Sequence, residues 1–208
     1  MLRIVDRPTA DPVTLSEAKA QLRLTDTSND ILVKALIPAA TRLVQSLVQR
    51  VVMPQTLEWV LQSWPQDRVI EIPVAPVAAD DINSITYVDW TTQTEQTLDP
   101  SLYVVQTRGD SVRIIPAFGV IWPIVFKWAS EPVVINFDAG YDDPCDIPGT
   151  IKAAILLQIR HLYSVGEINP LLRKDTVIGL GEKQYQLTPE TMQLIPDAVR
   201  NLILADVW

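Results

Sequence analysis

Most of the side chains that could carry chemistry lie close together between residues 133 and 161. Four aspartates and the only cysteine of the chain fall within the segment VVINFDAGYDDPCDIPGTIKAAI, residues 133–155, and the only histidine follows shortly afterwards. These residues are Asp138, Asp142, Asp143, Cys145, Asp146 and His161. In principle they could form a thiol nucleophile with its base, a site for a hard cation, or a hydrolytic pair of carboxylates.

A catalytic pair of Cys145 and His161 is disfavoured by the neighbours of each residue. A nucleophilic cysteine needs a lowered thiol pKa, whereas the acids around Cys145 would raise it. His161 lies in an apolar helical pattern, between Arg160 and Leu162, where we expect it to pack or cap. We therefore predict no catalytic residue here.

The aspartates also fit a calcium loop poorly. Such loops alternate oxygen ligands around a glycine and end in a bidentate acid, whereas DAGYDDPCD has no alternation, contains Pro144 and lacks a closing glutamate. We favour a turn from a strand into a helix, with Asp146 as an acid near the helix N-terminus. The prediction is no metal and no cofactor. A hydrolase that uses carboxylates such as Asp142 and Asp146 is a further hypothesis, weaker than the two functions described at the end of this section.

Composition sets broad limits on the class of protein. The 208 residues are 48% hydrophobic and 20% charged, which predicts a folded chain with a sizeable core. The net charge of −8 argues against a surface that attracts nucleic-acid phosphates. A single cysteine allows no intrachain disulfide, and no signal peptide or apolar run of ~20 residues is evident, so we expect synthesis in the cytoplasm and no membrane.

Residues 1–53 are predicted to form an N-terminal helical part. Thr14 and Glu17 have the spacing of a capping box, which indicates that a helix begins there. A second helix should follow Ser28 or Asn29, with Pro38 kinking or splitting it. Its apolar residues recur at three and four positions and predict a buried stripe, made of Ile31, Leu32, Ala35, Leu36, Ala39, Leu43, Val44, Leu47 and Val48.

From residue 54 to 141 the hydrophobic period changes to two. The segments TLEWVLQSW, VIEIPV, INSITYVDW, TEQTLDPSLYVVQ, SVRIIPA and PVVINFDAGY are short, rich in β-branched or aromatic residues, and bounded by turn residues. Consecutive strands without helices between them predict an antiparallel β-rich insert, folded as a small barrel or sandwich.

Residues 142–208 are predicted to form a C-terminal helical part. Helical spacing resumes at Ile147, and a long irregular loop is expected over residues 164–195. Pro196 and Asp197 should begin a terminal helix with an apolar face of Val199, Leu202, Ile203 and Val207. Such a helix either completes the chain's own core or docks in the groove of a partner. The predicted fold class is α+β, a helical base with an inserted antiparallel barrel or sandwich.

Taken in order, these pieces resemble a known family. PVTLSEAKAQLRLTDTSNDILVKALIPAATRLVQ is similar to the opening of the head–tail connector (neck adaptor) proteins of long-tailed phages and phage-like gene transfer particles. The segments SITYVDW…TLDPSLYVV, FDAGYDD…IPGTIKAAILLQIRHLYS and IPDAVRNLI fit the same pattern, so the resemblance covers nearly the whole chain. The chain departs from it at Pro38, where family members more often keep an unbroken alanine-rich helix.

The resemblance implies a non-enzymatic virion component. Family members form rings, usually of twelve copies, that bind beneath the portal, extend the DNA channel and present a platform for the next neck or tail protein (stopper or tail terminator). DNA would pass without specific binding, and the acidic balance suits such a conduit. The helical part forms the ring, and the C-terminal segment commonly reaches the portal. Carried over here, portal docking falls on Pro196, Val199, Leu202, Ile203, Leu204, Val207 and Trp208.

A second hypothesis comes from a different class of protein. The β-rich insert could be a sandwich of a tail or baseplate that binds a host glycan. In that case surface aromatics, namely Trp90, Trp122 and Trp128, would line the sugar site.

Overall fold

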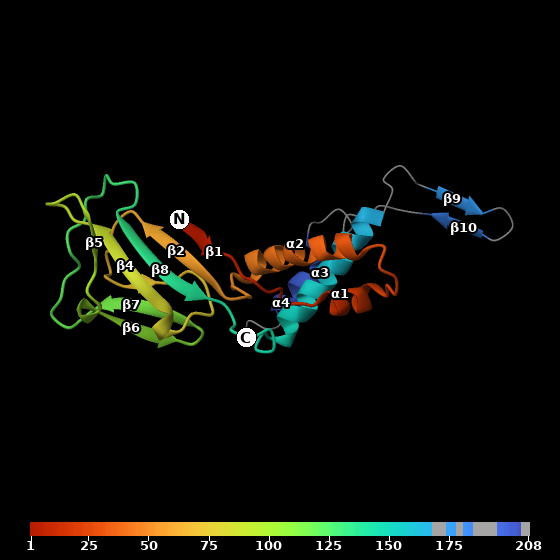
Figure 1. Ribbon diagram of the computed structural model, residues 1–208, viewed down its shortest axis with the longest axis horizontal. Helices are drawn as coiled ribbons and strands as arrows, with labels where there is room; N and C mark the ends of the chain where they lie inside the picture. Colours follow the sequence, from red (N-terminus) through yellow and green to blue (C-terminus); the bar gives the residue numbers. More distant parts are fainter. Residues whose placement is uncertain (168–173, 178–180, 185–194, 205–208) are drawn as a thin grey trace. The chain divides into compact units, whose positions relative to one another are not determined.

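The computed structural model describes residues 1–167, 174–177, 181–184 and 195–204. The chain divides into two compact units (Figure 1). One contains Met1–Ala10 with Gln49–Asp143 and is built from strands; the other contains Asp11–Val48 with Pro144–Trp208 and is mainly helical. We call them the sheet unit and the helical unit. The predicted α+β class, with helical segments flanking an antiparallel β-rich part, is confirmed.

The larger sheet of the sheet unit has five antiparallel strands in the order β1-β2-β8-β4-β5. The central strand β8 pairs with β2 on one side and β4 on the other, so Ile135 lies opposite both Trp59 and Ile85. β-branched residues at alternate positions explain why these segments form strands. The strand bounds are β1 Leu2–Asp6, β2 Gln55–Leu61, β4 Ile82–Val88, β5 Glu95–Thr97 and β8 Val133–Ala139.

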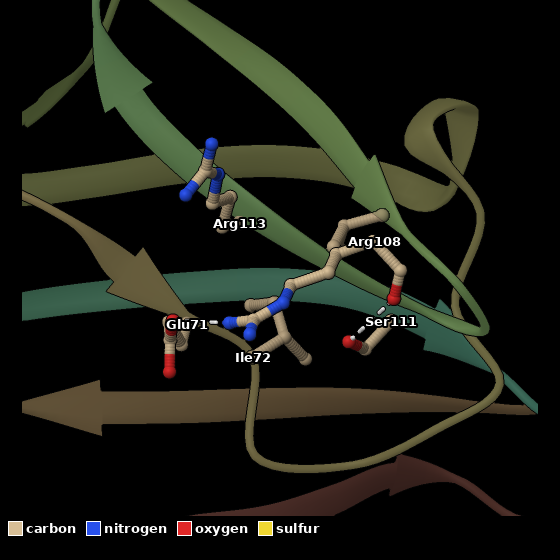
Figure 2. A pocket seen from close by; sticks show the side chains of 6 residues that line it. Glu71, Ile72, Arg108, Ser111 and Arg113 are labelled. Atoms are coloured by element: carbon tan, nitrogen blue, oxygen red, sulfur yellow. Dashed lines mark hydrogen bonds and ion pairs between the residues drawn. The ribbon is translucent and has the colours of Figure 1, made fainter.

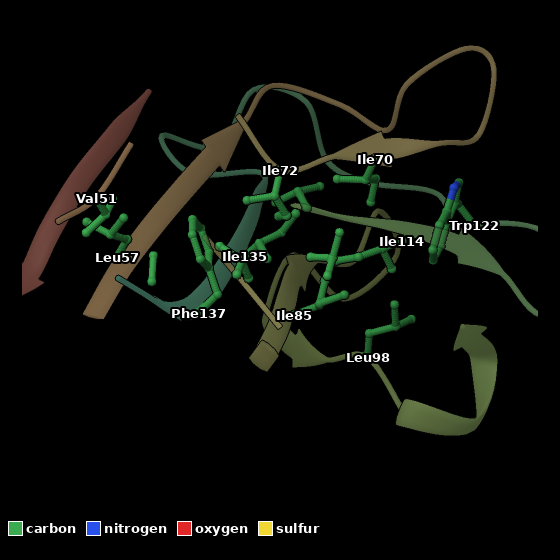
Figure 3. Close-up of a cluster of buried hydrophobic side chains, with 14 of the residues drawn as sticks. Val51, Leu57, Ile70, Ile72, Ile85, Leu98, Ile114, Trp122, Ile135 and Phe137 are labelled. Carbon is green, nitrogen blue, oxygen red and sulfur yellow. The ribbon is translucent and has the colours of Figure 1, made fainter. Parts of the chain in front are cut away.

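A three-stranded antiparallel sheet in the order β3-β7-β6 completes this unit. Its strands are β3 Ile70–Glu71, β6 Tyr103–Arg108 and β7 Ser111–Pro116. Short 3-10 helices precede β4 (η1, Ala79–Asp81) and β6 (η2, Pro100–Leu102). Both sheets contribute to one buried core, with Phe137 and Ile85 from the larger sheet and Ile70 and Ile114 from the smaller (Figure 3). The β-rich part is therefore a two-sheet sandwich.

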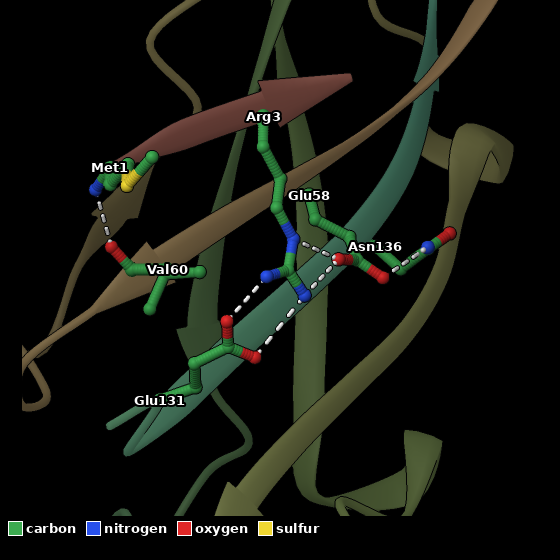
Figure 4. Close-up of polar contacts among 6 residues, drawn as sticks. All are labelled: Met1, Arg3, Glu58, Val60, Glu131 and Asn136. Atoms are coloured by element: carbon green, nitrogen blue, oxygen red, sulfur yellow. Dashed lines mark hydrogen bonds and ion pairs between the residues drawn. The ribbon is translucent and has the colours of Figure 1, made fainter. Parts of the chain in front are cut away.

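The first residues of the chain differ from the prediction that residues 1–53 form one helical part. Leu2–Asp6 is strand β1, which pairs with β2 at the edge of the larger sheet. The N-terminal ammonium group donates to the Val60 carbonyl at 2.7 Å, and Arg3 donates to Glu58 at 2.6 Å and also to Glu131 (Figure 4). These contacts hold a strand whose five residues are all exposed, so no alternation of buried and exposed positions identifies it from sequence.

The helical unit is built on α1 (Leu15–Leu22), α2 (Asp30–Val48), α3 (Gly149–Glu167) and α4 (Asp197–Leu204). The predicted capping box is present, because Glu17 N donates to Thr14 Oγ1 at 3.2 Å and Thr14 N donates to Glu17 Oε2 at 2.7 Å. Helices α1 and α2 pack on α3, and α4 packs on α3 as well. The buried face of α3 contains Ile151, Ala154, Ile155, Gln158 and Ile159.

Helix α2 differs from its prediction in two ways. It is one helix through Pro38, not two pieces. Its buried side chains are Val33, Ile37, Ala40, Thr41 and Val44, whereas Ile31, Leu32, Ala35 and Ala39 of the predicted stripe are exposed. Apolar residues occupy more than one face of this helix, so spacing alone did not identify the face that packs.

The predicted loop over residues 164–195 contains regular structure. Helix α3 continues to Glu167, and strands β9 (Lys174–Val177) and β10 (Gly181–Gln184) pair antiparallel with Val177 opposite Gly181. The sequence of these strands is charged and polar, with little β-propensity, which explains why the pattern suggested a loop.

Candidate interaction surfaces

The acidic segment of residues 138–146 forms the end of a strand and the turn that follows it. Asp138 belongs to β8 and accepts hydrogen bonds from Thr56 Oγ1 at 2.6 Å and Asn83 Nδ2 at 3.1 Å. Asp142, Asp143 and Asp146 are exposed in the turn that leads from β8 toward α3. Among the residues that the structure describes, no group of three or more acids, histidines and cysteines is arranged to hold a metal ion.

Cys145 and His161 lie at different places along the helical unit. Cys145 is exposed in the turn before α3, which begins at Gly149. With a rise of about 1.5 Å per residue, His161 lies about 18 Å along the helix axis from Gly149. The two residues therefore belong to different elements, Cys145 to the turn and His161 to the later part of α3.

A polar hollow of about 180 Å³ lies on the smaller sheet (Figure 2). Arg108 Nη1 is 3.4 Å from Glu71 Oε1 in a largely exposed ion pair, and Arg113 Nε donates to Gln106 Oε1 at 2.9 Å. Ser111 Oγ donates to the carbonyl of Arg108 at 3.2 Å and has no base beside it among these contacts. The hollow is therefore a charged surface feature, and it lacks the parts of a nucleophilic site.

Three aromatic rings form an exposed triangle beside β4. The centroids of Trp90 and Trp128 are 5.4 Å apart, and Phe126 lies 5.9 Å from Trp90 and 5.6 Å from Trp128. Trp90 N donates to the Ile124 carbonyl, and Phe126 N donates to the Val88 carbonyl, so backbone pairing holds the two segments together. Both indoles are well exposed, as is Ile124.

The turn that carries Trp90 is fixed by Asp89. Its Oδ1 accepts from the backbone N–H of Thr91 at 2.8 Å and of Thr92 at 2.9 Å. These backbone donors, followed by the Thr92 hydroxyl, lower the pKa of the Asp89 carboxyl from its ordinary value. The triangle is therefore presented on a defined turn.

Trp122 does not join this surface, which corrects the grouping of Trp90, Trp122 and Trp128 as surface aromatics. Trp122 is only 7% exposed, stacks on Trp64 with ring centroids 4.8 Å apart, and donates from Nε1 to the Arg68 carbonyl at 3.0 Å. A buried tryptophan with a satisfied indole N–H is part of the core. The predicted glycan site is therefore not assembled from these three residues.

The residues predicted to dock on the portal are found in several environments. Val199 and Ile203 are buried within the helical unit, where α4 packs on α3. Pro196 and Leu202 are half-buried. The side chain of Leu204 and residues Val207 and Trp208 lie outside the described part of the chain. Of the two roles that the sequence left open for this helix, the described part of its apolar face completes the unit's own core.

Two large apolar side chains are exposed in the first turn of α2. Ile31 is 86% exposed and Leu32 is 48% exposed. By length and composition this helix could cross a membrane, although core helices of water-soluble proteins meet the same criterion. An open, mainly apolar groove of about 430 Å³ also lies along α1, lined by Leu15, Ser16, Lys19, Ala20 and Leu24.

An ion pair and a hydrogen bond hold the start of α2 in the helical unit. Lys19 Nζ lies 2.6 Å from Asp30 Oδ1 in a partly buried ion pair between α1 and α2. Asn29 Nδ2 donates to Tyr163 Oη at 3.2 Å and so connects the same point to α3. These contacts hold the N-terminus of α2, and with it the exposed Ile31 and Leu32, in a fixed place on the unit.

Comparisons with known proteins show what the chain is similar to. The family model described as phage gp6-like head-tail connector protein matches residues 12–97. The resemblance to phage-like head–tail connector proteins predicted from the sequence is thereby confirmed over these residues. A comparison with curated proteins gave no match.

Solved structures of gene transfer agent (GTA) particles contain chains of the same fold. A chain from the neck of an empty GTA particle computed with C6 symmetry is 20% identical, with a TM-score of 0.69, over 99% of this chain and 94% of that one. A chain from the virion of a native GTA particle is 17% identical, with the same score and coverage. A third, from the neck of a native GTA particle computed with C12 symmetry, is 20% identical with a TM-score of 0.60, over 86% and 88% of the two chains.

Proposed function

We propose that this chain is a neck adaptor of a phage-like virion. It assembles into a ring beneath the portal, extends the DNA channel, and offers a docking platform to the next neck or tail protein. The single observation that carries this proposal is the fold shared with neck chains of GTA particles over 99% of this chain. The connector family match over residues 12–97 supports it from the sequence side.

The proposed ring is homo-oligomeric, with twelve copies as the first expectation. The C12 symmetry used for one related neck and the C6 symmetry used for another are both consistent with a ring of twelve subunits. A subunit of a closed ring carries two different surfaces, one for each neighbour. We propose that the exposed Ile31 and Leu32 of α2 contribute to such contacts in the helical part.

The proposed role is structural and not enzymatic. The residues that suggested chemistry are arranged as a turn, a helix and cross-strand hydrogen bonds, as described above. The net charge of −8 supports a DNA conduit, because carboxylates offer phosphates no attraction and packaged DNA must slide without sticking. In this proposal the protein resides in the virion neck after synthesis in the host cytoplasm.

Portal docking is proposed for the C-terminal segment. Some of its residues hold α4 on its own unit, and the others contact the portal. Val199 and Ile203 anchor α4 on its own unit. Pro196, Leu202 and Leu204, followed by Val207 and Trp208, provide the apolar groups for the portal. A terminal tryptophan is a common anchor residue of protein interfaces.

The test uses the full-length protein and the purified portal of the same particle. Wild-type protein should form rings by negative-stain microscopy, alone or on adding portal, and should co-sediment with portal. Replacing Leu202 and Trp208 with serine should weaken portal binding at least about tenfold, because such anchors contribute 2 kcal/mol or more. Circular dichroism should show an unchanged fold, since both buried anchors of α4 remain.

Two outcomes would contradict parts of this proposal. Portal binding that is unchanged in the Leu202→Ser, Trp208→Ser variant would mean that the docking segment is wrong. A protein that stays monomeric with portal present and does not co-sediment with it would mean that the adaptor role is wrong. A matched control is Val104→Ser, which removes an exposed apolar side chain from β6 in the sheet unit and should leave portal binding unchanged.

A further inference from the structure

Several large apolar side chains are exposed together on the surface beside β4. We define the aromatic patch as Trp90, Ile124, Phe126 and Trp128. Trp128 and Ile124 are each 74% exposed and Trp90 is 47% exposed. Aromatic side chains bury about 150–250 Å² each, so the patch presents roughly 400–500 Å² of apolar surface. Patches of this size on a soluble protein commonly mark an interaction site.

The patch is pre-formed, which favours a specific interface. The rings already contact one another at centroid distances below 6 Å, and the Asp89 turn holds Trp90 in place. Little side-chain freedom remains to be lost on binding, and this reduces the entropic cost of an interface. The estimated area is also more than half of the ~800 Å² that one partner contributes to a standard interface.

A second exposed apolar surface lies on strand β1. This strand is the outermost one at one end of the order β1-β2-β8-β4-β5, whereas the patch is joined to the end of β4, where Phe126 N donates to the Val88 carbonyl. On β1, Leu2, Ile4 and Val5 are 40–52% exposed. An edge strand also presents backbone N–H and C=O groups that are open to a neighbour.

We propose that the aromatic patch of one copy packs against the β1 edge of the next copy. This inference rests on the proposed ring, because a head-to-tail ring needs two different, complementary surfaces on each subunit. The aromatic patch and the β1 edge are two such surfaces, formed by different residues of the sheet unit. The sheet unit then contributes its own subunit contact, in addition to any made by the helical unit.

The charges beside the two surfaces are complementary. Lys127 lies between Phe126 and Trp128 in the sequence, and Asp6 is the last residue of β1. Both are exposed, and neither forms an ion pair within the part of the chain that the structure describes. By contrast, Arg3 of the same strand is already paired with Glu58 and Glu131. Lys127 of one copy and Asp6 of the next are therefore two oppositely charged groups that are available to pair across the contact.

The experiment measures the stability of assembled rings of the full-length protein. Mass photometry follows their dissociation on dilution. Trp90→Ser with Trp128→Ser should raise the protein concentration at half-dissociation at least about tenfold, because two exposed anchors are lost from the contact. Val104→Ser removes an exposed apolar residue from the smaller sheet and should leave that concentration unchanged. Thermal unfolding of each variant confirms that the subunit stays folded.

A charge exchange identifies the surface that receives the patch. Lys127→Glu alone and Asp6→Lys alone should each weaken the ring, and the two together should restore it toward the wild-type midpoint. Rings that resist the double tryptophan variant would overturn this inference and leave the adaptor role intact. A weakened ring that the charge exchange does not restore would overturn the assignment to the β1 edge. If wild-type protein forms no ring, with or without portal, the proposed function itself fails.

Discussion

Thr56 donates a hydrogen bond from its hydroxyl group to Asp138 Oδ1 at 2.6 Å, across the paired strands β2 and β8. On the other side of β8, Asn83 donates to Asp138 Oδ2 at 3.1 Å and to Asn136 at 3.0 Å. The first acid of the 138–146 segment is therefore a cross-strand acceptor in the larger sheet. Its role is to join three strands, and the exposed acids that follow it belong to a turn.

Thr56→Val should lower the free energy of unfolding of the sheet unit by about 1–2 kcal/mol, because the hydrogen bond to a charged acceptor is lost. Valine is also β-branched and keeps the strand preference of the position. Denaturant unfolding followed by tryptophan fluorescence measures the change. Thr97→Val, at an exposed position of strand β5, is the matched control and should change the free energy of unfolding by less than about 0.5 kcal/mol. A Thr56→Val variant as stable as wild type would show that this contact contributes nothing.

Gly140 approaches the backbone of another segment at the end of β8. Its φ is +124°, and a Cβ atom placed there would lie 2.5 Å from both the carbonyl carbon and the carbonyl oxygen of Met53. Neither group can move without shifting the chain that leads into β2. Gly140→Ala should therefore destabilise the sheet unit by about 2–4 kcal/mol, through backbone strain and displacement.

Gly109→Ala separates the two causes of that destabilisation. Gly109 has a φ of +61° in the turn between β6 and β7, but a Cβ atom there would meet nothing within 4 Å. Alanine at this position should lower the free energy of unfolding only through its left-handed conformation, by about 1–2 kcal/mol. Thermal unfolding of both variants should rank Gly140→Ala as clearly less stable. Equal destabilisation would contradict the role of the Met53 contact.

Sequence patterns predicted the elements whose side chains alternate cleanly. In β8 the residues Val133, Ile135 and Phe137 are buried and the residues between them are less so, as a period of two requires. The capping box of Thr14 and Glu17 is a local signal and appears as predicted. The junction from β8 through the turn to α3 was also predicted, because strand, turn residues and helical spacing follow one another there.

Elements defined by long-range contact were not predictable from their own residues. β1 has five exposed residues and is a strand only because β2 lies beside it. In α2 the apolar residues cover two faces, and packing on α3 selected Val33 and Ile37 over Ile31 and Leu32. The sequence of α2 alone does not determine which of its faces is buried. The buried face depends on α3, a helix more than 100 residues further along the chain.

The burial of single residues on the candidate surfaces was also not predictable from the sequence. Trp122 and Trp128 belong to the same stretch of the sequence between β7 and β8, yet one is 7% and the other 74% exposed. Trp122 is buried because Trp64 and the Arg68 carbonyl lie beside it in the fold. For the C-terminal helix, spacing correctly indicated an apolar face with Val199 and Ile203, but only the structure shows that α3 covers it.

The capping box should make the stability of the helical unit depend on pH. Hydrogen bonds from the Thr14 backbone N–H and then from its hydroxyl, with a smaller contribution from the charge of Lys152, hold the pKa of the Glu17 carboxyl below its ordinary value of 4.5. Because the pKa is lower in the folded state, the ionised form stabilises the fold. That contribution is present above pH 4.5 and is lost as the pH falls through the lower, folded-state pKa.

Glu17→Gln removes this ionisation while keeping an acceptor at the same position. The variant should be less stable than wild type by about 0.5–1 kcal/mol at pH 7, the range of an exposed capping interaction. The difference should shrink as the pH falls below 4.5, since wild-type Glu17 then becomes protonated. Urea unfolding followed by far-ultraviolet circular dichroism, repeated between pH 7 and pH 3, measures it. Glu95→Gln, at an exposed acid of β5, is the matched control and should show no such convergence. A stability difference for Glu17→Gln that stays constant over this range would contradict the role of the carboxylate. Protonation of wild-type Glu17 should remove the advantage of its charge over the neutral glutamine.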